Sequence, residues 1–378
     1  MSERGPILIN AVSQVFGGGV VVAQNLTAKM AELRPDDRLI LVSSLDEVAE
    51  FSYPENVEVC YLPALLSRPN RWYYEQRHLP AVIAERGARA ILNLGGFACA
   101  RAKVPQLGVW QNPHIYTPTP IAQPLGLRLY AAIQRVVARL SLSKNVQNIF
   151  LTEASITDAR SWWPMDEIAH TVINNGVDRG RIVKRNARPS AERDNTVLSI
   201  GHLYYHKNYE AMIDAIACYR DRYGDDLELE IVGSRWDEAY SKSLDQRIID
   251  RKVGDLVTLA GTATAEEVAS KLDRAGVYLI TSRLETFGLT TLEAMGSGLP
   301  VVVADASCLP EVAGDAALYC DPNDPNDIAE KLHRVLSDPS LQADLRGRGF
   351  ARVEEFSWDR AAERYWEEID RAIRGGLD

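Results

Sequence analysis

The sequence predicts an α/β protein made of two doubly wound domains of similar size. Short apolar runs rich in β-branched residues alternate with longer segments whose apolar residues recur every three to four positions. The chain has 378 residues, which is more than one hydrophobic core usually serves. A polar, highly charged stretch at 178–195 contains Pro189 and is typical of a linker. The predicted domains are therefore 1–177 and 195–355, followed by a terminal segment, 356–378.

The predicted strands are apolar on both faces, which is typical of parallel strands covered by helices on each side. The first domain has such runs at 7–12, 38–44, 57–62, 89–94, 107–110, 148–152 and 171–175. The second domain has them at 196–201, 227–233, 257–261, 277–282, 301–305 and 317–320. Helices are expected between the strands, for example at 208–222 and 265–274.

The terminal segment predicts an amphipathic helix. Its apolar residues recur at helical spacing: Trp358, Ala361, Ala362, Tyr365, Trp366, Ile369 and Ile373. Two tryptophans in one terminal helix indicate docking onto a folded body rather than free fraying. Spacing alone leaves two destinations open, because the helix could close the second domain or cross back onto the first.

Composition excludes several classes of protein. Apolar residues make up 46% of the chain and charged residues 25%, an ordinary globular mixture. The net charge of −10 argues against a nucleic-acid-binding protein. No apolar stretch reaches the roughly 18 residues of a membrane span, and the N-terminal run is too short for a signal peptide. Peripheral contact with a membrane stays open.

The cysteines indicate reduced thiols of a cytoplasmic protein. The five of them show no CxxC or Cys/His spacing and their number is odd: Cys60, Cys99, Cys218, Cys308 and Cys320. Neither a disulfide framework nor a metal site is expected from them.

Three consecutive glycines, 17–19, lie where the first predicted strand gives way to a helix. Gly18 and Gly19 would let the backbone approach a ligand, and the helix would direct its free N–H groups at an anionic group. A tight structural turn is the alternative interpretation. The spacing matches neither the dinucleotide fingerprint nor a P-loop, which disfavours a dehydrogenase.

The stretch ETFGLTTLE, 285–293, carries the main chemical signal. Glu285 falls in the loop after the strand at 277–282, and Glu293 falls inside a short helix. Between them, the N–H groups of Gly288, Leu289 and Thr290 are predicted to lie free at the first turn of that helix. Free amides suit a diphosphate and carboxylates suit sugar hydroxyls, so the pattern predicts a sugar-nucleotide site.

A lysine stands in the loop after the first strand of the second domain. Lys207 precedes Asn208, a plausible N-cap residue, and could reach across the carboxyl ends of the strands, where open α/β sheets bind ligands. His202 and His206 flank it. A solvated surface lysine and two structural histidines are the alternative interpretation.

The sequence TSRLETFGLTTLEAMGSGLPVVVADASCLPEVAGDAALYCDPND, 281–324, closely resembles the donor-site region of the family 4 retaining glycosyltransferases, which have the GT-B fold. VINNGVD (172–178), IGHLYYHKN (200–208) and FSWDRAAERYW (356–366) also resemble segments of that family. The likeness covers the second domain and the tail and is weak over 1–170 apart from the glycine loop. It implies two Rossmann-like domains facing a cleft, with the nucleotide on the second, the acceptor mostly on the first, and the last helix crossing back to the first.

The resemblance also implies roles for single residues. Glu285 and the backbone of Phe287 and Gly288 would hold the hydroxyls of the donor sugar. Leu289 and Thr290 would offer N–H groups to the diphosphate.

Three further roles follow from the same resemblance. Glu293 would accept hydrogen bonds from the ribose hydroxyls, and Lys207 would neutralise the leaving phosphate. Gly18 and Gly19 would approach the diphosphate or the acceptor from the first domain.

Two positions depart from the family pattern. The family usually has an arginine where this chain has His202 or His206, and histidine is charged only part of the time near neutral pH. Many relatives also have a histidine directly after the strand at 107–110. Here Gln111 and Asn112 follow, with His114 beyond them, so these three are candidates for contacts with the donor sugar or the acceptor.

The expected function is retaining glycosyl transfer from a nucleotide-diphosphate sugar to an acceptor hydroxyl, in polysaccharide, O-antigen or glycolipid biosynthesis. The chain contains no Asp-x-Asp triplet, so no metal and no other cofactor is expected. The expected partners are the sugar nucleotide and a saccharide or lipid-linked saccharide acceptor, at a cytoplasmic location that allows peripheral contact with the inner membrane face. A sugar-nucleotide epimerase of the same architecture and a catalytically silent binding subunit remain alternatives.

A basic and aromatic cluster in the first domain has two interpretations. It comprises Arg68, Arg71, Trp72, Tyr73, Tyr74 and Arg77. It could contact an anionic lipid-linked acceptor, or it could be the face of an ordinary amphipathic helix.

Overall fold

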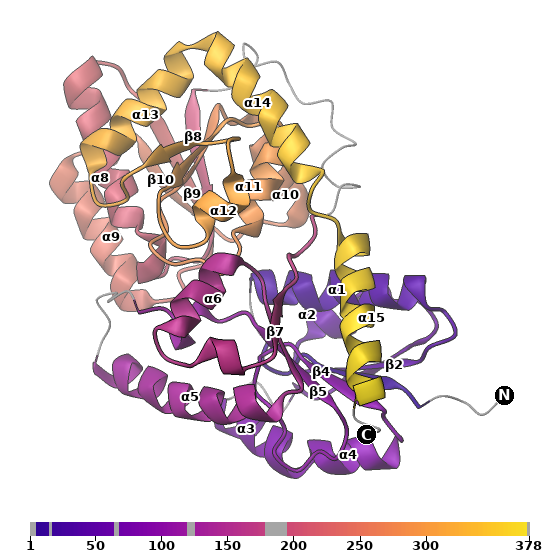
Figure 1. The fold of residues 1–378 in the computed structure, drawn as a ribbon. Coiled ribbons are helices and arrows are strands. Elements are labelled where there is room, and N and C mark those ends of the chain that lie inside the picture. Colours follow the sequence, from indigo (N-terminus) through magenta and orange to yellow (C-terminus); the bar gives the residue numbers. More distant parts are fainter. Residues whose placement is uncertain (1–4, 15–16, 64–67, 119–124, 178–194, 376–378) are drawn as a thin grey trace. The chain divides into compact units, whose positions relative to one another are not determined.

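The computed structural model describes residues 5–14, 17–63, 68–118, 125–177 and 195–375. The chain divides into two compact units. The first holds the described residues up to Gly176 and again from Ser357 onward, and the second holds those from Val177 to Phe356 (Figure 1). The predicted linker lies outside the described residues except for its last position.

The first unit is built on a seven-stranded parallel sheet with the strand order β3-β2-β1-β4-β5-β6-β7. Its strands are β1 (Ile7–Asn10), β2 (Leu39–Ser43), β3 (Val57–Tyr61), β4 (Ala90–Asn93), β5 (Gln106–Trp110), β6 (Gln147–Phe150) and β7 (His170–Val172). All neighbouring pairs are parallel, so the carboxyl ends of the strands meet at one edge. The strand order reverses between β1 and β4, and ligands of open α/β sheets bind outside such a switch point.

Helices cover both faces of this sheet (Figure 1). They are α1 (Gly18–Leu33), α2 (Asp46–Ala49), α3 (Arg68–Arg77), α4 (Leu79–Glu85), α5 (Leu125–Lys144), α6 (Glu153–Arg160) and α15 (Trp358–Gly375), with the 3₁₀ turns η2 (Pro113–Ile115) and η3 (Met165–Glu167). Because crossovers are right-handed, α1 and α2 lie on one face, while α3, α4, α5 and α6 lie on the other.

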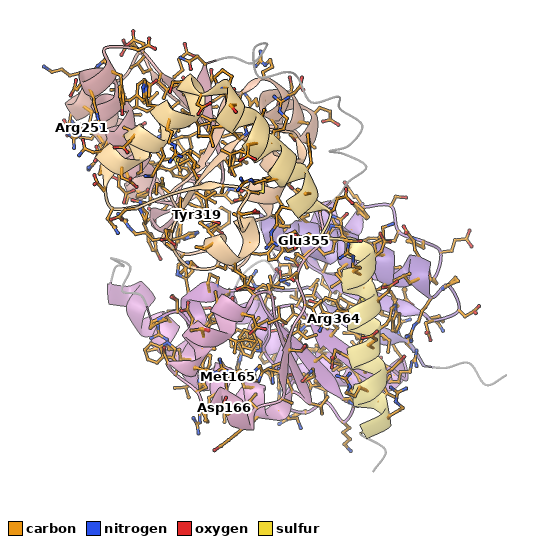
Figure 2. All side chains as sticks on the ribbon, turned by 45° about the horizontal axis from the view of Figure 1, so that its top comes forward. Met165, Asp166, Arg251, Tyr319, Glu355 and Arg364 are labelled. Atoms are coloured by element: carbon orange, nitrogen blue, oxygen red, sulfur yellow. The ribbon has the colours of Figure 1, made fainter. Side chains whose placement is uncertain are left out.

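The last helix, α15, returns to the first unit, as the family resemblance implies. It packs against α1, β4 and β5. Trp366 is buried and donates its indole N–H to the Met30 carbonyl at 2.9 Å, and Arg34 forms a two-pronged ion pair with Asp370. Arg364, labelled in Figure 2, donates to the Thr171 hydroxyl at 3.3 Å.

The second unit has a six-stranded parallel sheet with the order β10-β9-β8-β11-β12-β13. Its strands are β8 (Thr196–Ile200), β9 (Glu228–Val232), β10 (Val257–Gly261), β11 (Val277–Ile280), β12 (Val301–Ala304) and β13 (Leu318–Cys320). Its helices are α8 (Tyr209–Tyr223), α9 (Glu238–Arg251), α10 (Ala265–Arg274), α11 (Leu289–Gly296), α12 (Leu309–Ala313), α13 (Pro325–Ser337) and α14 (Pro339–Val353), with the 3₁₀ turn η5 (Tyr205–Lys207). Here the strand order reverses between β8 and β11.

The predicted fold class is confirmed. Every apolar run assigned to a strand forms one, and the predicted helix at 265–274 has the observed bounds of α10. The five cysteines are free thiols. The predicted cleft concerns the relative placement of the two units and stays a prediction.

Candidate functional site

Lys207 and Glu285 lie together at the switch point of the second unit. Lys207 ends the turn η5 that follows β8, and Glu285 lies in the loop that follows the neighbouring strand β11. The Lys207 ammonium donates to Glu285 Oε1 at 2.5 Å. Only 19% of the lysine side chain and 12% of the glutamate side chain are exposed, so the pair is shielded from much of the solvent screening that weakens surface ion pairs.

Two serines fix Glu285 in place. The Ser282 hydroxyl donates to the same carboxylate oxygen, Oε1, at 2.9 Å. Ser307 binds the backbone of Glu285 twice, because its hydroxyl donates to the Glu285 carbonyl at 2.9 Å and accepts the Glu285 N–H at 3.1 Å. Ser307 itself has φ of 57°, a left-handed conformation uncommon for residues other than glycine. The carboxylate is therefore oriented through both its side chain and its backbone.

The lysine side chain runs over a glycine at the end of β8. A Cβ on Gly201 would lie 3.3 Å from Lys207 Cε and 2.9 Å from the Tyr209 hydroxyl. The neighbouring Gly233, after β9, is equally constrained, since a Cβ there would lie 1.9 Å from the Gly201 carbonyl oxygen. Gly201 therefore makes room for the lysine side chain at the carboxyl edge of the sheet, and Gly233 makes room for the Gly201 backbone.

The Asn208 side chain connects the loop that carries Lys207 to two other loops at the carboxyl edge of the sheet. The prediction that it caps the following helix is wrong. Asn208 occupies the N-cap position of α8, but its φ of 59° turns the side chain away from the helix and no side-chain cap forms. Its amide instead donates to the Thr281 carbonyl at 3.1 Å and to the Pro322 carbonyl at 2.7 Å. The Thr281 hydroxyl in turn donates to the Asn208 carbonyl at 3.0 Å.

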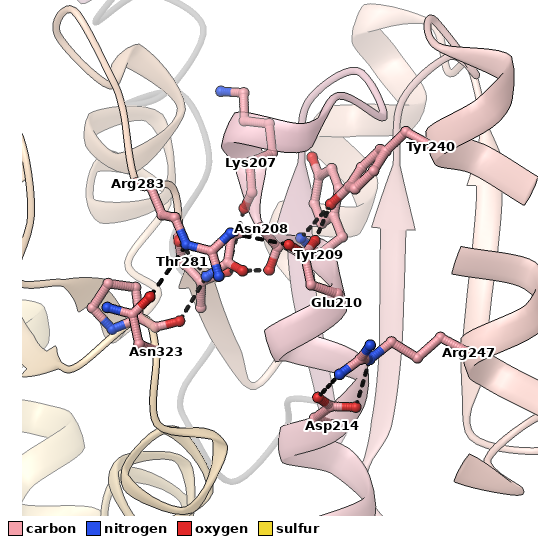
Figure 3. A network of polar contacts seen from close by, with 11 residues as sticks. Lys207, Asn208, Tyr209, Glu210, Asp214, Tyr240, Arg247, Thr281, Arg283 and Asn323 are labelled. Carbon is pink, nitrogen blue, oxygen red and sulfur yellow. Dashed lines mark hydrogen bonds and ion pairs between the residues drawn. The ribbon is translucent and has the colours of Figure 1, made fainter. Parts of the chain in front are cut away.

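A polar network behind this loop joins several elements of the second unit (Figure 3). Arg283, two residues before Glu285, donates to Glu210 of α8 at 3.0 Å and to Asn323 at 3.3 Å. The Tyr240 hydroxyl donates to the other oxygen of Glu210. This network ties the loop that holds Glu285 to the body of the unit.

Gly288 is the N-cap residue of the helix α11. Gly288 has φ of 82°, and a Cβ there would lie 2.9 Å from Leu309 Cδ2. Thr291 N–H donates to the Gly288 carbonyl. Within the described residues, the N–H groups of Gly288, Leu289 and Thr290 have no hydrogen-bond acceptor, so they remain available to a ligand.

Glu293 lies in the middle of α11 and is partly buried. Burial raises the pKa of the Tyr278 phenol on β11, and the charges of Glu293 and Glu285 raise it further. Both carboxylates therefore lie close enough to the Tyr278 phenol for their charges to raise its pKa. Phe287 turns its side chain into the core, where it meets Phe356 edge-on with ring centroids 5.5 Å apart. The family resemblance predicts that the backbone of Phe287 contacts the donor sugar. A buried side chain is compatible with that prediction and does not test it.

The two histidines have different surroundings. His202 Nδ1 lies 2.6 Å from the Ser234 hydroxyl, and its ring lies beside Trp236. Burial, with a smaller effect of the Lys207 charge, lowers the pKa of His202 below its usual value. His206 packs against Tyr204 with ring centroids 5.1 Å apart, and its carbonyl accepts the Arg283 N–H. His202 is therefore close enough to Lys207 to feel its charge.

The candidates in the first unit share the carboxyl edge of its sheet. Gln14, which follows β1, and Gln111, which follows β5, both donate to the Leu94 carbonyl after β4, at 2.7 and 3.1 Å. A Cβ on Gly19 would lie 2.0 Å from Gln14 Oε1, so this glycine makes room for the glutamine. Gly18 is exposed and begins α1. The glycine loop and Gln111 thus lie at the same switch point.

Asn112 and His114 have a local structural role in addition to any binding role. The Asn112 side chain caps the turn η2 by accepting the His114 N–H at 3.2 Å. Asn112 is exposed, and His114 is partly buried.

Two absences concern the described residues only. They contain no cluster of three His, Cys, Asp or Glu side chains that could hold a metal ion. No helix among them has both the length and the apolar content needed to cross a bilayer.

The structure brings Lys207, Glu285 and the amides of Leu289 and Thr290 to one sheet edge. Ser282, Ser307 and Gly201 also belong to this site and were missed in the sequence. Of these, only Gly201 leaves a readable signal, because a glycine ends each of the first three strand motifs of the second unit: Gly201, Gly233 and Gly261.

Comparison with known proteins finds a family match for part of the chain. Residues 181–352 match the sequence model of the glycosyl transferases group 1. The O-antigen chain mannosyltransferase RfbU of Salmonella typhimurium is 29% identical over 196 residues, which cover 51% of this chain and 52% of the relative. The chain spans about half or less of the length of the first curated relatives that it matches.

Two solved structures share the fold over almost the entire chain. Sucrose-phosphate synthase of Thermosynechococcus elongatus superposes with a TM-score of 0.78 at 19% identity, covering 98% of this chain and 100% of that one. HepE of Anabaena, solved in complex with UDP-glucose, gives a TM-score of 0.75 at 19% identity, with coverages of 97% and 100%. The match to the glycosyl transferases group 1 model is thus confined to residues 181–352, while the chain has the GT-B fold of these two solved proteins.

Proposed function

We propose that the protein transfers a sugar from a nucleotide-diphosphate sugar to an acceptor hydroxyl. One observation carries the proposal: at the switch point of the second unit, a lysine and a carboxylate meet helix amides that have no acceptor among the described residues. An ammonium and N–H donors match a diphosphate, whereas a carboxylate that only accepts matches sugar hydroxyls. The family of residues 181–352 supports the same reaction class.

In this proposal Lys207 and Glu285 part when the donor binds. The ammonium transfers from the carboxylate to the leaving phosphate, and Glu285 Oε1 accepts a hydroxyl of the sugar in its place. Ser282 and Ser307 keep the carboxylate oriented while its lysine partner moves. Glu293 takes the ribose hydroxyls further along α11.

The chemical step breaks the bond between the anomeric carbon and the phosphate oxygen and forms a bond to the acceptor oxygen. Negative charge develops on the departing diphosphate, where Lys207 and the N–H groups of Leu289 and Thr290 stabilise it. One preorganised donor of this kind contributes about 3–4 kcal/mol to the transition state. We propose retention at the anomeric carbon, with the leaving phosphate taking the proton of the acceptor hydroxyl. The site then needs neither a separate general base nor a metal ion.

The donor and acceptor classes are also proposals. Three relatives are named mannosyltransferases, two of them of O-antigen chains, so a mannosyl donor is the first to test. The acceptor is a saccharide or a lipid-linked saccharide bound mainly by the first unit. The candidates there are Gly18, Gly19, Gln111, Asn112 and His114. Such an acceptor places the protein in the cytoplasm, with peripheral contact at the inner membrane face.

A two-step experiment tests this function. A thermal-shift screen with guanosine, uridine, thymidine and adenosine diphosphates first identifies the base. Nucleotide release from the matching sugar nucleotides is then measured with and without cell-envelope glycolipids. Release that depends on acceptor supports the transferase, conversion to a second sugar nucleotide without acceptor indicates an epimerase, and binding without turnover indicates a silent subunit.

Two controls address the finer points. Activity that survives EDTA supports a metal-independent step, whereas full loss with rescue by magnesium would overturn it. The anomeric configuration of the product, read by NMR coupling constants, must match that of the donor. Inversion would refute retention while leaving the transferase assignment intact.

A further inference from the structure

The helix α5 of the first unit is apolar on two opposite faces. Its buried face packs Ala138 and Leu142 against the core of the unit. Its outer face exposes Ile133, Val136 and Leu140, whose exposed fractions are 60%, 65% and 68%. At about 100° per residue these three lie within about 60° of one another, roughly opposite Leu142. An exposed row of apolar side chains on a helix that already buries its opposite face marks an interaction surface, so the outer face indicates an unseen partner.

The charge of α5 is opposite in sign to that of the chain. The helix contains four basic residues and no acidic residue, whereas the chain carries a net charge of −10. Arg135 is engaged within the unit, because it donates to the Ile115 carbonyl and lies over the Trp162 ring. Arg139 and Lys144 are exposed, and neither forms an ion pair with any described residue. The outer row of aliphatic side chains is therefore accompanied by available positive charge.

A second helix on the same face of the sheet adds aromatic side chains. The side chains of Trp72 and Tyr73 of α3 are 56% and 53% exposed. The connections that contain α3 and α5 cross the same face of the sheet. Helices α1 and α15 lie on the opposite face (Figure 1). Exposed tryptophan and tyrosine favour the boundary between water and lipid, where an apolar ring and a polar tip are both satisfied.

We propose that the outer face of α5 binds the surface of an anionic lipid bilayer. Aliphatic side chains would enter the acyl boundary, and Arg139 and Lys144 would pair with lipid phosphates. A second copy of the chain is the less suitable partner, because a symmetric contact would place the basic helix against itself. One row of side chains also offers much less than the ~800 Å² per partner of a typical stable interface. The inference does not depend on the proposed reaction, since lipid binding requires neither donor nor acceptor.

Co-sedimentation of the full chain with vesicles tests this directly. The probes are vesicles of phosphatidylcholine alone and vesicles containing about one third phosphatidylglycerol. We expect binding to the anionic vesicles, weaker binding to the neutral ones, and release as the salt concentration rises. Binding to neither kind of vesicle would overturn the proposal.

Matched variants localise the surface. Leu140→Ser should lower anionic-vesicle binding about ten-fold, whereas Ile249→Ser on α9, at an equally exposed position of 67%, should leave it unchanged. The double change Arg139→Gln with Lys144→Gln should weaken binding to anionic vesicles only, with Lys242→Gln as its control. Unchanged melting temperatures exclude misfolding.

Two results would contradict the assignment. Equal vesicle binding by Leu140→Ser and Ile249→Ser would remove α5 as the binding surface. A dimer in light scattering that Leu140→Ser dissociates, without vesicle binding, would identify a second copy as the occupant of this face. Nucleotide binding in the thermal-shift screen is measured alongside, so a failure of the proposed function is distinguished from a failure of membrane docking.

Discussion

Lys207 and Glu285, 78 positions apart in the chain, form an ion pair at the carboxyl edge of the second sheet. A second pair in the same unit has the same separation of 2.5 Å and similar burial, but it lies elsewhere. Lys271 of α10 pairs there with Glu230, which lies within β9. Variants of the two pairs therefore separate two effects. Breaking the Lys271–Glu230 pair removes a lysine–glutamate contact only, whereas breaking the Lys207–Glu285 pair also alters the candidate site.

Removing the lysine charge should lower turnover. Lys207→Met should reduce kcat by about 10²–10³-fold, because one preorganised donor to the departing charge is lost. The measurement is nucleotide release with the donor identified in the thermal-shift screen. Lys271→Met, which breaks the matched pair, should leave kcat unchanged. Equal kcat values for wild type and Lys207→Met would refute the role of this lysine.

Glycine at the start of α11 should be irreplaceable. Gly288→Ala places a Cβ in a left-handed conformation, at a cost of about 1–2 kcal/mol, and close to Leu309. The shift of the helix start should weaken donor binding about ten-fold or more, measured by calorimetry. Gly224→Ala is the control, since its φ of 66° is similar but no atom lies within 4 Å of the added Cβ. It should lose stability without losing affinity, and equal affinity losses in the two variants would contradict the role of the helix start.

Donor binding should tighten as the pH falls, because of His202. Burial and Lys207 hold its pKa below the usual value in the unliganded chain, and a bound diphosphate would raise it. Binding would then take up a proton, so affinity should rise as the pH falls from 8 through the usual histidine range near ~6.5. A nucleotide-diphosphate sugar is the ligand of choice, because its phosphates do not titrate there.

The same histidine provides the control for that measurement. His202→Gln should remove the pH dependence of donor affinity, whereas His206→Gln should retain it. An unaltered pH profile in His202→Gln would exclude His202 as the phosphate neighbour. The unliganded chain should also lose stability as the pH falls below the usual histidine pKa, because the unfolded chain then binds a proton that the folded site disfavours.

The last helix should stabilise the first unit. Trp366→Ala removes a buried ring and its hydrogen bond to Met30, which should cost about 3–5 kcal/mol. Hydrogen exchange should show reduced protection in α1, β4 and β5, with α8 and α13 little changed. Trp72→Ala, at an exposed position, serves as the control. Loss of protection confined to the second unit would contradict this assignment.

Much of the fold could be predicted because parallel strands leave a strong signal. Val301–Ala304 and Val277–Ile280 are buried on both faces and read as continuous apolar runs. The destination of the last helix could not be predicted from its spacing, since an amphipathic stripe specifies a buried face but not its partner. The family resemblance supplied that partner.

The candidate site was predictable only where its residues are adjacent in sequence. Glu285, Gly288 and Glu293 lie within nine positions, so one local pattern reveals them. Ser307 reaches Glu285 from a different loop, and nothing in its neighbourhood marks that contact. The Asn208 side chain resembled a helix cap because sequence does not reveal the positive φ that turns it away.

The return of α15 to the first unit has a consequence for biosynthesis. A ribosome makes the chain in order, yet the first unit is completed only after the second, because its covering helix α15 follows Phe356 in the sequence. The second unit, a continuous segment, can fold as soon as it emerges. During translation the first unit therefore exposes the surface on which Trp366 later packs. An exposed apolar surface of this kind is prone to aggregation, so chaperone binding is most useful before α15 has been made.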